Sequence, residues 1–103
     1  MDLEKLRRCI REGQYQWRKH TLLRLAQREI SQDIILEVVD KGEIIEDYPE
    51  DKPFPSCLIL GWVQGRPYHV VIALDLEGFM AYIITAYEPS LDKFEPDFKS
   101  RRK

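Results

Sequence analysis

Cys57-Leu-Ile-Leu-Gly-Trp-Val63 is the first of three apolar runs in this chain, and it is followed by Pro67-Tyr-His-Val-Val-Ile-Ala-Leu74 and Phe79-Met-Ala-Tyr-Ile-Ile-Thr-Ala-Tyr87. All three runs are rich in β-branched and aromatic residues, which favour strands. The connections at residues 64–66 and 75–78 are short, and each has a glycine suited to positive φ. The sequence therefore predicts a meander of three antiparallel strands.

The first half of the chain has helical patterns. Leu3, Leu6 and Ile10 fall at the spacing of a short amphipathic helix. Ser31 is a suitable N-cap, and Gly42 is a suitable C-terminal stop for the helix that follows it. The expected elements before the meander are helices within residues 1–13, 20–31 and 31–42, a short strand at 43–48 and an ordered, proline-rich loop at 49–55.

These elements predict an α+β fold, with two to three N-terminal helices packed on a mainly antiparallel sheet of about four strands. The 103 residues fit a single domain. The helices are expected to cover one face of the sheet, which leaves the other face or its rim for a site. The tail, residues 91–103, is expected to be frayed or to serve as an arm for a partner.

The charge of the chain is unevenly distributed. The net charge is -2, but residues 1–42 carry nine Lys/Arg against seven Asp/Glu, whereas residues 43–56 carry one against five. A general basic field is thereby excluded, so any anion site must be built from a few local arginines. No apolar run approaches the roughly 18 residues of a membrane span, and the N-terminus does not resemble a signal peptide. A cytoplasmic protein with no membrane partner is expected.

One helical segment, residues 20–31, places a histidine and two arginines four residues apart. At 100° per residue, His20, Arg24 and Arg28 share an arc of about 80° and cover roughly 12 Å of helix axis. We call this row the His/Arg ridge. The apolar residues expected on the buried side are Leu22, Leu23, Ala26 and Ile30, with Leu25 at the margin.

A second polar cluster is expected on the sheet. Alternation puts His69, Val71 and Ala73 on one side of their strand. Pairing across the turn at 75–78 brings residues near 69 opposite those near 85, with a register uncertainty of one or two residues. On the last strand, Ile83, Thr85 and Tyr87 are expected to share a face, so His69, Thr85 and Tyr87 are candidate neighbours.

If the His/Arg ridge borders this cluster, the combination suits phosphodiester chemistry. An imidazole or phenol can deprotonate a ribose 2′-hydroxyl, another group can protonate the leaving oxygen, and arginine can stabilise the phosphorane. No metal or other cofactor is expected, because the 2′-hydroxyl is an internal nucleophile and the histidines have no metal-ligand spacing.

Each of these features also has a purely structural interpretation. The His/Arg ridge is consistent with a solvated helix face, and His69 with a hydrogen-bonded structural histidine. Tyr48 and Tyr87 are consistent with packing residues whose hydroxyls reach water.

An ordered set of motifs adds a family resemblance. The pattern His20-x3-Arg24-x3-Arg28-x-Ile30-Ser31 is followed by Gly42-Glu-Ile-Ile-Glu-Asp-Tyr48-Pro, by Gly65-Arg66-Pro67-Tyr-His69-Val-Val and by Ile84-Thr85-Ala-Tyr87-x-Pro89. Over residues 16–90 the chain resembles the domain-of-unknown-function 4258 family. That family is considered similar in fold to the RelE/ParE-like and BrnT-like toxins of type II toxin-antitoxin systems, many of which cleave messenger RNA without metal.

The resemblance implies a set of site residues and partners. It matches His20, Arg24, Arg28 and His69, with Arg66, Thr85 and Tyr87 beside them. We therefore expect His20, His69 and Tyr87 to be catalytic and Arg24, Arg28, Arg66 and Thr85 to bind phosphate. The implied partners are RNA, with the ribosome as one setting, and a cognate antitoxin, which in some family members has a zinc-binding part and a helix-turn-helix part.

Two alternatives to a toxin-like ribonuclease stay open. The chain is slightly acidic, whereas such toxins tend to be basic. A non-catalytic binding module could use the same His/Arg ridge to hold an acidic protein partner. A small-molecule pocket lined by Trp62, Tyr68 and Phe79 is the third hypothesis.

Overall fold

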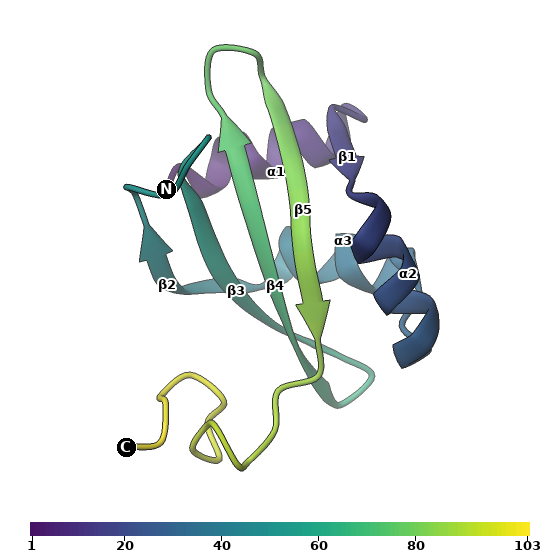
Figure 1. Ribbon diagram of the computed structural model, residues 1–103, viewed down its shortest axis with the longest axis vertical. Coiled ribbons are helices and arrows are strands. Elements are labelled where there is room, and N and C mark those ends of the chain that lie inside the picture. Colours follow the sequence, from purple (N-terminus) through teal and green to yellow (C-terminus); the bar gives the residue numbers. More distant parts are fainter.

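The computed structural model describes all 103 residues. The chain forms three helices and a five-stranded sheet, joined by loops and followed by the C-terminal tail (Figure 1). The sheet order is β1-β5-β4-β3-β2, with β1 parallel to β5 and the other neighbours antiparallel. The expected α+β class and the antiparallel meander are confirmed, and the sheet has one strand more than the four expected. No helix is long and apolar enough to cross a membrane. The elements are α1 (Leu3–Arg11), β1 (Tyr15–Trp17), α2 (Lys19–Arg28), α3 (Gln32–Lys41), β2 (Glu43–Tyr48), β3 (Ser56–Val63), β4 (Arg66–Asp75) and β5 (Met80–Tyr87).

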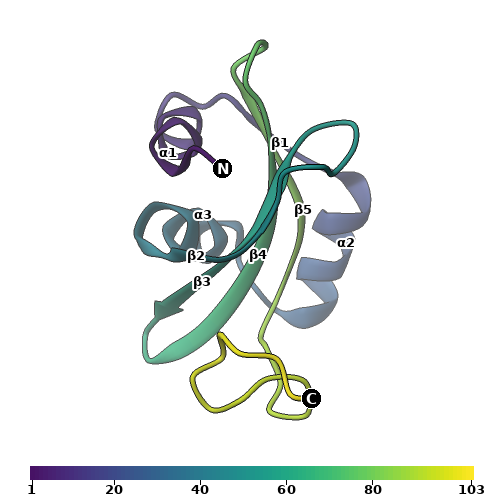
Figure 2. The ribbon, with the colours of Figure 1, turned by 90° about the vertical axis from the view of Figure 1, so that its left-hand side faces the viewer.

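The three helices lie against one face and one edge of the sheet. α1 and α3 cover one face, whereas α2 lies beside the β5 edge, displaced toward the other side (Figures 1 and 2), and its Leu25 joins the same core. The covered face carries the core, because alternate residues of β3 and β4 point into it. We call the face turned away from α1 and α3 the open face. The core residues of the central strands are Cys57, Ile59, Val63, Tyr68, Val70, Ile72 and Leu74.

The strand register follows from two local features. Gln64 and Gly65 both have positive φ (53° and 77°), which closes a two-residue turn between β3 and β4. In β5 the register shifts beside Val71, so Ile83 pairs with Ile72 on the core face while Thr85 pairs with Val71 on the open face. The expectation that Ile83 shares a face with Thr85 was therefore wrong, because a β-bulge interrupts the alternation.

The buried side of α2 differs from the expectation. Leu22 and Leu23 are 37% and 57% exposed, whereas Thr21 and Leu25 are buried. The Thr21 hydroxyl donates hydrogen bonds to the carbonyls of Ile84 (2.6 Å) and Ile83 (3.2 Å). β1 pairs only with residues 81–83 of β5, so the carbonyls beyond it need donors from elsewhere. α2 turns its Thr21 side toward β5 because the Thr21 hydroxyl supplies such a hydrogen-bond donor.

The C-terminal tail, residues 91–103, is folded against the sheet and not frayed. Phe94 is 2% exposed, and it forms an isolated bridge with Arg101. Lys99 and Arg101 form ion pairs with the β2 carboxylates of Glu43 (2.7 Å) and Glu46 (2.8 Å). The tail covers the end of the open face where β5 ends, and it is the yellow segment in Figure 1.

Candidate functional site

His69 lies on β4, fully buried beneath the tail. It pairs with Tyr87 across the β4–β5 ladder, and its Nδ1 lies 3.3 Å from the Tyr87 hydroxyl. Its Nε2 lies 2.8 Å from the carbonyl oxygen of Phe98, and the ring of Phe94 packs edge-on against the imidazole at 4.6 Å. Both ring nitrogens therefore have partners, and one partner belongs to the tail.

These contacts define the tautomer of His69. A carbonyl oxygen only accepts hydrogen bonds, so Nε2 carries the proton that is donated to Phe98. In the neutral ring, Nδ1 is then free to accept the hydroxyl proton of Tyr87. Burial lowers the pKa of His69, which keeps the ring neutral at pH 7, and burial raises the pKa of Tyr87. The result is a chain of hydrogen bonds from Tyr87 through His69 to the tail backbone.

Tyr87 lines a cavity of about 330 Å³ between the end of β5 and the tail. Arg28 reaches this cavity from α2, and its guanidinium donates to the carbonyl of Ala86 (2.6 Å). Lys93 and Arg101 reach it from the tail. Three cationic side chains thus share the cavity with one carboxylate. Glu46 pairs with Arg101 from outside the cavity, but Arg28 and Lys93 still outnumber Glu88, so the lining favours an anion. The complete lining is Arg28, Tyr87, Glu88, Ser90, Lys93, Phe94 and Arg101.

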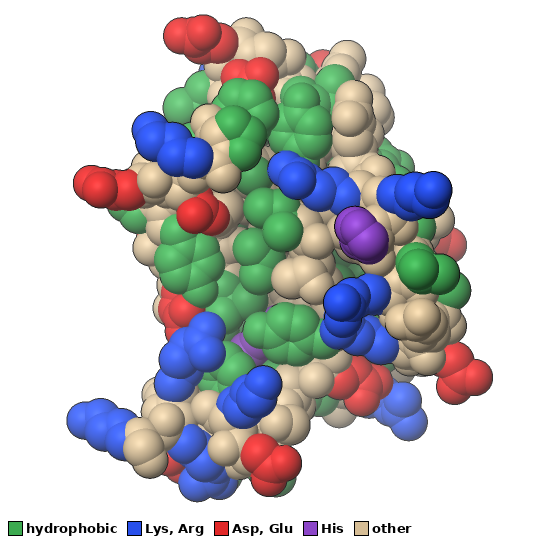
Figure 3. Space-filling model, in the orientation of Figure 1, with side chains coloured by type: hydrophobic (Ala, Val, Ile, Leu, Met, Phe, Trp, Pro, Cys, Tyr) green, Lys and Arg blue, Asp and Glu red, His purple; other side chains and the backbone are tan.

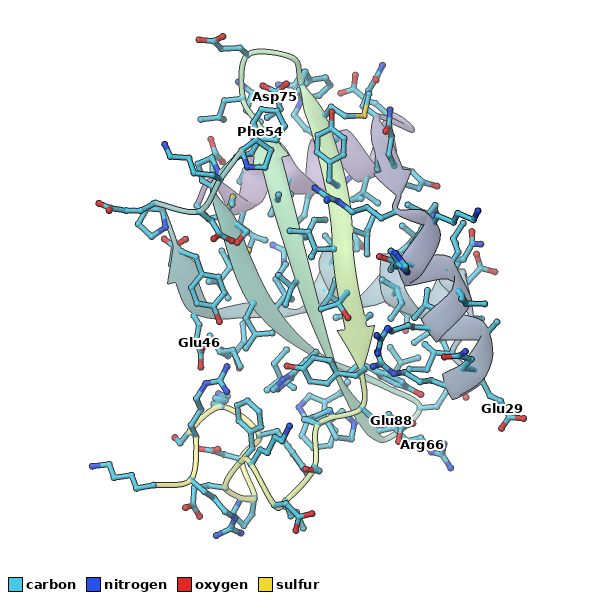
Figure 4. The ribbon with its side chains drawn as sticks, viewed as in Figure 1. Glu29, Glu46, Phe54, Arg66, Asp75 and Glu88 are labelled. Atoms are coloured by element: carbon cyan, nitrogen blue, oxygen red, sulfur yellow. The ribbon has the colours of Figure 1, made fainter.

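A second cavity of about 390 Å³ shares part of this lining. Arg28, Tyr87 and Glu88 line both cavities, and Arg66 lines the second. Arg66 forms an ion pair with Glu88 (3.4 Å) near the β3–β4 turn, where the two side chains lie together in Figure 4. Because Arg66 partly neutralises the carboxylate of Glu88, the cationic character of the shared region is increased.

The structure brings together some of the candidate residues and separates others. Arg28, Arg66 and Tyr87 share a cavity, and His69 lies directly behind Tyr87. His20 and Arg24 are exposed on α2 and line neither cavity. Counted from Thr21 at 100° per residue, Arg28 lies about 20° from the buried stripe but His20 about 100° from it. This angular spread explains why only the last member of the His/Arg ridge reaches the strand.

Thr85 is half-buried and pairs with Val71, two ladder pairs away from His69 on the open face. It lines neither of the two cavities. It is therefore a neighbour of the cluster, as expected from the strand alternation, without being part of the cavity wall.

An ion-pair network joins the tail to β2. The Arg101 guanidinium bonds both carboxylate oxygens of Glu46, which lowers the pKa of that carboxyl. The Tyr48 hydroxyl donates to the same carboxylate, and burial, together with this hydrogen bond, raises the pKa of Tyr48 to about 12. Tyr48 is thus a half-buried packing residue with a bonded hydroxyl. Figure 4 shows Glu46 directed toward the tail.

Besides Glu88, four residues of the cavity wall were not among the sequence candidates: Ser90, Lys93, Phe94 and Arg101. All four lie in the last fourteen residues of the chain, close to or within the segment expected to be frayed. Two aromatic residues in an otherwise charged tail, Phe94 and Phe98, were the available signal that this segment packs.

The aromatic pocket of the third hypothesis was not found. Tyr68 is buried in the core, Trp62 packs edge-on against Phe98 on the other face, and Phe79 lies under the guanidinium of Arg8. The three side chains share no cavity.

Comparison with known proteins places the chain in a family. The model of the domain of unknown function DUF4258 matches residues 17–88. The match spans the region from β1 to the end of β5 and includes the His/Arg ridge, His69 and Tyr87, but not the tail. Neither the curated proteins nor the solved structures give a match. Because the family match covers well over half of the 103 residues, the chain belongs to the DUF4258 family.

Proposed function

We propose that this protein is a toxin-like, metal-independent endoribonuclease whose reaction centre is Tyr87. One observation carries the proposal: the Tyr87 hydroxyl is bonded to a neutral histidine, and Tyr87 lines a cavity with three cationic side chains. A base oriented by a third group, next to a site for anions, is the arrangement that phosphodiester transesterification requires.

The roles differ from those expected for the two histidines. Tyr87 takes the proton of the ribose 2′-hydroxyl and passes its own proton to Nδ1 of His69. The 2′-oxygen then attacks phosphorus, the bond from phosphorus to the 5′-oxygen breaks, and Lys93 protonates the leaving oxygen. His69 acts through Tyr87. The Phe98 carbonyl accepts the proton on Nε2 of His69 and so keeps the Nδ1 lone pair of His69 directed at the Tyr87 phenol. His20 has no part in this scheme, because it lines neither cavity.

The pKa shifts set the order of proton transfer. Burial opposes charge on both partners, since it raises the pKa of Tyr87 and lowers that of His69. A phenolate–imidazolium pair is therefore not populated in the resting site, so the two proton transfers accompany the attack on phosphorus. Arg28 and Arg101 would stabilise the charge that then develops on the phosphorane, and loss of one such donor costs on the order of 3 kcal/mol.

The test is cleavage of single-stranded RNA by the purified chain in the presence of a chelator. We expect products that end in a 2′,3′-cyclic phosphate and a rate that falls at least about 100-fold in Tyr87→Phe. Tyr15→Phe is the matched control, because Tyr15 lies on β1 outside both cavities. An inactive native chain, or equal rates for the native and Tyr87→Phe proteins, would overturn the proposal.

A second candidate is a non-catalytic module that binds an acidic protein, such as an antitoxin. The observation in its favour is the exposed surface of α2, where Leu22 and Leu23 lie next to the imidazole of His20 and the cationic Arg24. An apolar patch with a cationic border suits an acidic amphipathic segment. Under this candidate, Arg24→Glu abolishes complex formation and no RNA is cleaved between about pH 5 and 8. Cleavage that depends on Tyr87 would exclude it as the sole function.

A further inference from the structure

The open face has an aromatic surface away from the tail. Tyr48, Ala73 and Tyr82 lie in one row across the sheet. Tyr48 of β2 pairs with Ser56 of β3, Ser56 pairs with Ala73 of β4, and Ala73 pairs with Tyr82 of β5. Phe54, from the loop before β3, lies over this end of the face, as labelled in Figure 4. Its ring stacks beside that of Tyr82, with centroids 5.5 Å apart and planes within 4° of parallel. All three aromatic residues are half-buried, and we call Tyr48, Phe54 and Tyr82 the aromatic platform.

The aromatic platform and the proposed reaction centre lie on one strand. Tyr82 pairs with Ala73 and Tyr87 pairs with His69, so the two tyrosines are four β4 residues apart, or about 13 Å. Val71 and Thr85 lie between them on the same face and are half-exposed. An extended strand of a few nucleotides can bridge this distance.

A row of basic residues, the His/Arg ridge, borders the same strand. α2 contacts β5 through Thr21 at Ile83 and Ile84, and through Arg28 at Ala86, so the helix and the strand run in the same direction. The His/Arg ridge therefore follows the rim of the open face from the level of the aromatic platform to the cavity. Figure 3 shows lysine and arginine side chains on this border, with hydrophobic side chains between them and the opposite edge.

Two acidic side chains near the aromatic platform have hydrogen-bond partners, and one of them, Glu46, is in an ion pair. Glu46 is bonded to Arg101 and Tyr48, and the carboxylate of Asp51 accepts a hydrogen bond from the Ser56 hydroxyl (2.6 Å). The half-buried rings keep part of their surface open to an anionic polymer, whose charge is met by the arginines of α2.

We propose that the open face binds single-stranded RNA, with bases stacked on the aromatic platform and phosphates held along the His/Arg ridge. This inference rests on the proposed function, for which it names the surface that binds the substrate. Base stacking on tyrosine and phenylalanine is sequence-tolerant, and a double helix does not offer the faces of its bases. The aromatic rings favour nucleobases over an acidic peptide, which would use the cations but not the ring faces.

The probe is a labelled hexanucleotide of 2′-O-methyluridine, which lacks the nucleophile and so reports binding without cleavage. Fluorescence anisotropy compares it with an abasic hexamer, a short RNA duplex and an acidic amphipathic peptide. We expect the hexanucleotide to bind at least about tenfold more tightly than the abasic strand or the duplex. Tyr82→Ala should weaken its binding by roughly 5- to 150-fold, and Tyr82→Phe should retain it because the ring face is kept.

Several outcomes separate this inference from the proposed function. Any of three results would overturn the proposed binding of RNA by the aromatic platform. They are equal affinity for the abasic strand or the duplex, no effect of Tyr82→Ala in a folded variant, and tighter binding of the peptide than of the hexanucleotide. If the platform fails while a dinucleotide is still cleaved in a Tyr87-dependent way, the ribonuclease proposal stands alone. If Tyr82-dependent binding is found without cleavage of unmodified RNA, the platform stands and the ribonuclease proposal fails.

Discussion

Replacing Phe94 with alanine should release the C-terminal tail from the open face. The Phe94 side chain is 2% exposed, packs edge-on against the His69 ring at 4.6 Å and has the Arg101 guanidinium above it at 5.0 Å. The remaining contacts of the tail are exposed ion pairs, such as that of Lys99 with Glu43, the hydrogen bond of His69 to the Phe98 carbonyl, and the packing of Phe98 against Trp62, which is 54% exposed. Phe94 is therefore the main apolar anchor of the tail.

The size of the effect follows from these contacts. Burial of a phenylalanine contributes about 1.5–3 kcal/mol, its aromatic pair about 0.5–1.5 and a partly exposed cation–π contact about 0.5–1. Because exposed ion pairs contribute about 0–1 kcal/mol each, they cannot hold the tail alone. We expect Phe94→Ala to lower the free energy of unfolding by about 3 kcal/mol, which corresponds to a decrease in Tm on the order of 15 °C.

Two measurements check this prediction. Urea unfolding gives the loss of stability, and brief trypsin treatment reports tail release through cleavage after Lys99, Arg101 and Arg102. Leu91→Ala is the matched control, because Leu91 lies in the same tail but is 51% exposed, and it should change stability by less than about 0.5 kcal/mol. A loss below about 1 kcal/mol for Phe94→Ala, with a tail as resistant to trypsin as in the native chain, would refute the reasoning.

Two further predictions concern the fold around the site. Burial lowers the pKa of His69 in the folded chain below the ordinary histidine value of 6.5. At pH values below about 6.5 the unfolded chain therefore binds more protons than the folded chain. The contribution of His69 to stability should be constant above about pH 7 and decrease as the pH falls toward 5. Urea midpoints measured across this range should fall less in His69→Gln, and an equal fall in both proteins would contradict the assignment. Gly42→Ala should cost about 2–3 kcal/mol in thermal unfolding, because its Cβ would lie 2.5 Å from the carbonyl oxygen of Val38 and 2.6 Å from that of Leu60. Gly13→Ala, where the added Cβ meets open space but φ is +74°, should cost only about 1–2 kcal/mol, and equal losses would exclude crowding as the cause.

The pairing of His69 with Tyr87 could be predicted from sequence because short turns constrain register. The connection at 75–78 fixes which residues of β4 and β5 face each other, within the one or two residues allowed. The structure places Tyr87 opposite His69, two residues beyond the centre of the estimate. Alternation along β4 likewise predicted which side carries His69, since no bulge interrupts the β3–β4 ladder.

The orientation of α2 could not be predicted from its own residues. Apolar periodicity placed Leu22 and Leu23 on the buried side, but the edge carbonyls of β5 needed hydrogen-bond donors. Thr21 and Arg28 supply those donors, so satisfying polar groups decided the packing of a short helix. That requirement arises only after β1 has paired with part of β5, which is a tertiary event.

The tail was mispredicted for a related reason. Phe94 and Phe98 are isolated among charged residues and form no helical or strand period, so local pattern indicates an unstructured segment. Their partners are His69 and Trp62, which lie about thirty residues earlier in the chain and are exposed to the tail only once the meander has formed. The missed half of the cavity wall follows from this one error.

The candidate site therefore exists only when the tail is docked. Arg28 approaches the cavity from α2, whereas Lys93 and Arg101 approach it from the tail, and the tail carbonyl of Phe98 also fixes the tautomer of His69. An anion held between Arg28 and the tail cations would bind the docked state in preference to the undocked one. By linkage, such an anion must strengthen tail docking by as much as tail docking strengthens its own binding. The geometry of the cavity and the order of the tail are thus two aspects of one equilibrium, and an anion that fills this cavity would also stabilise the docked tail.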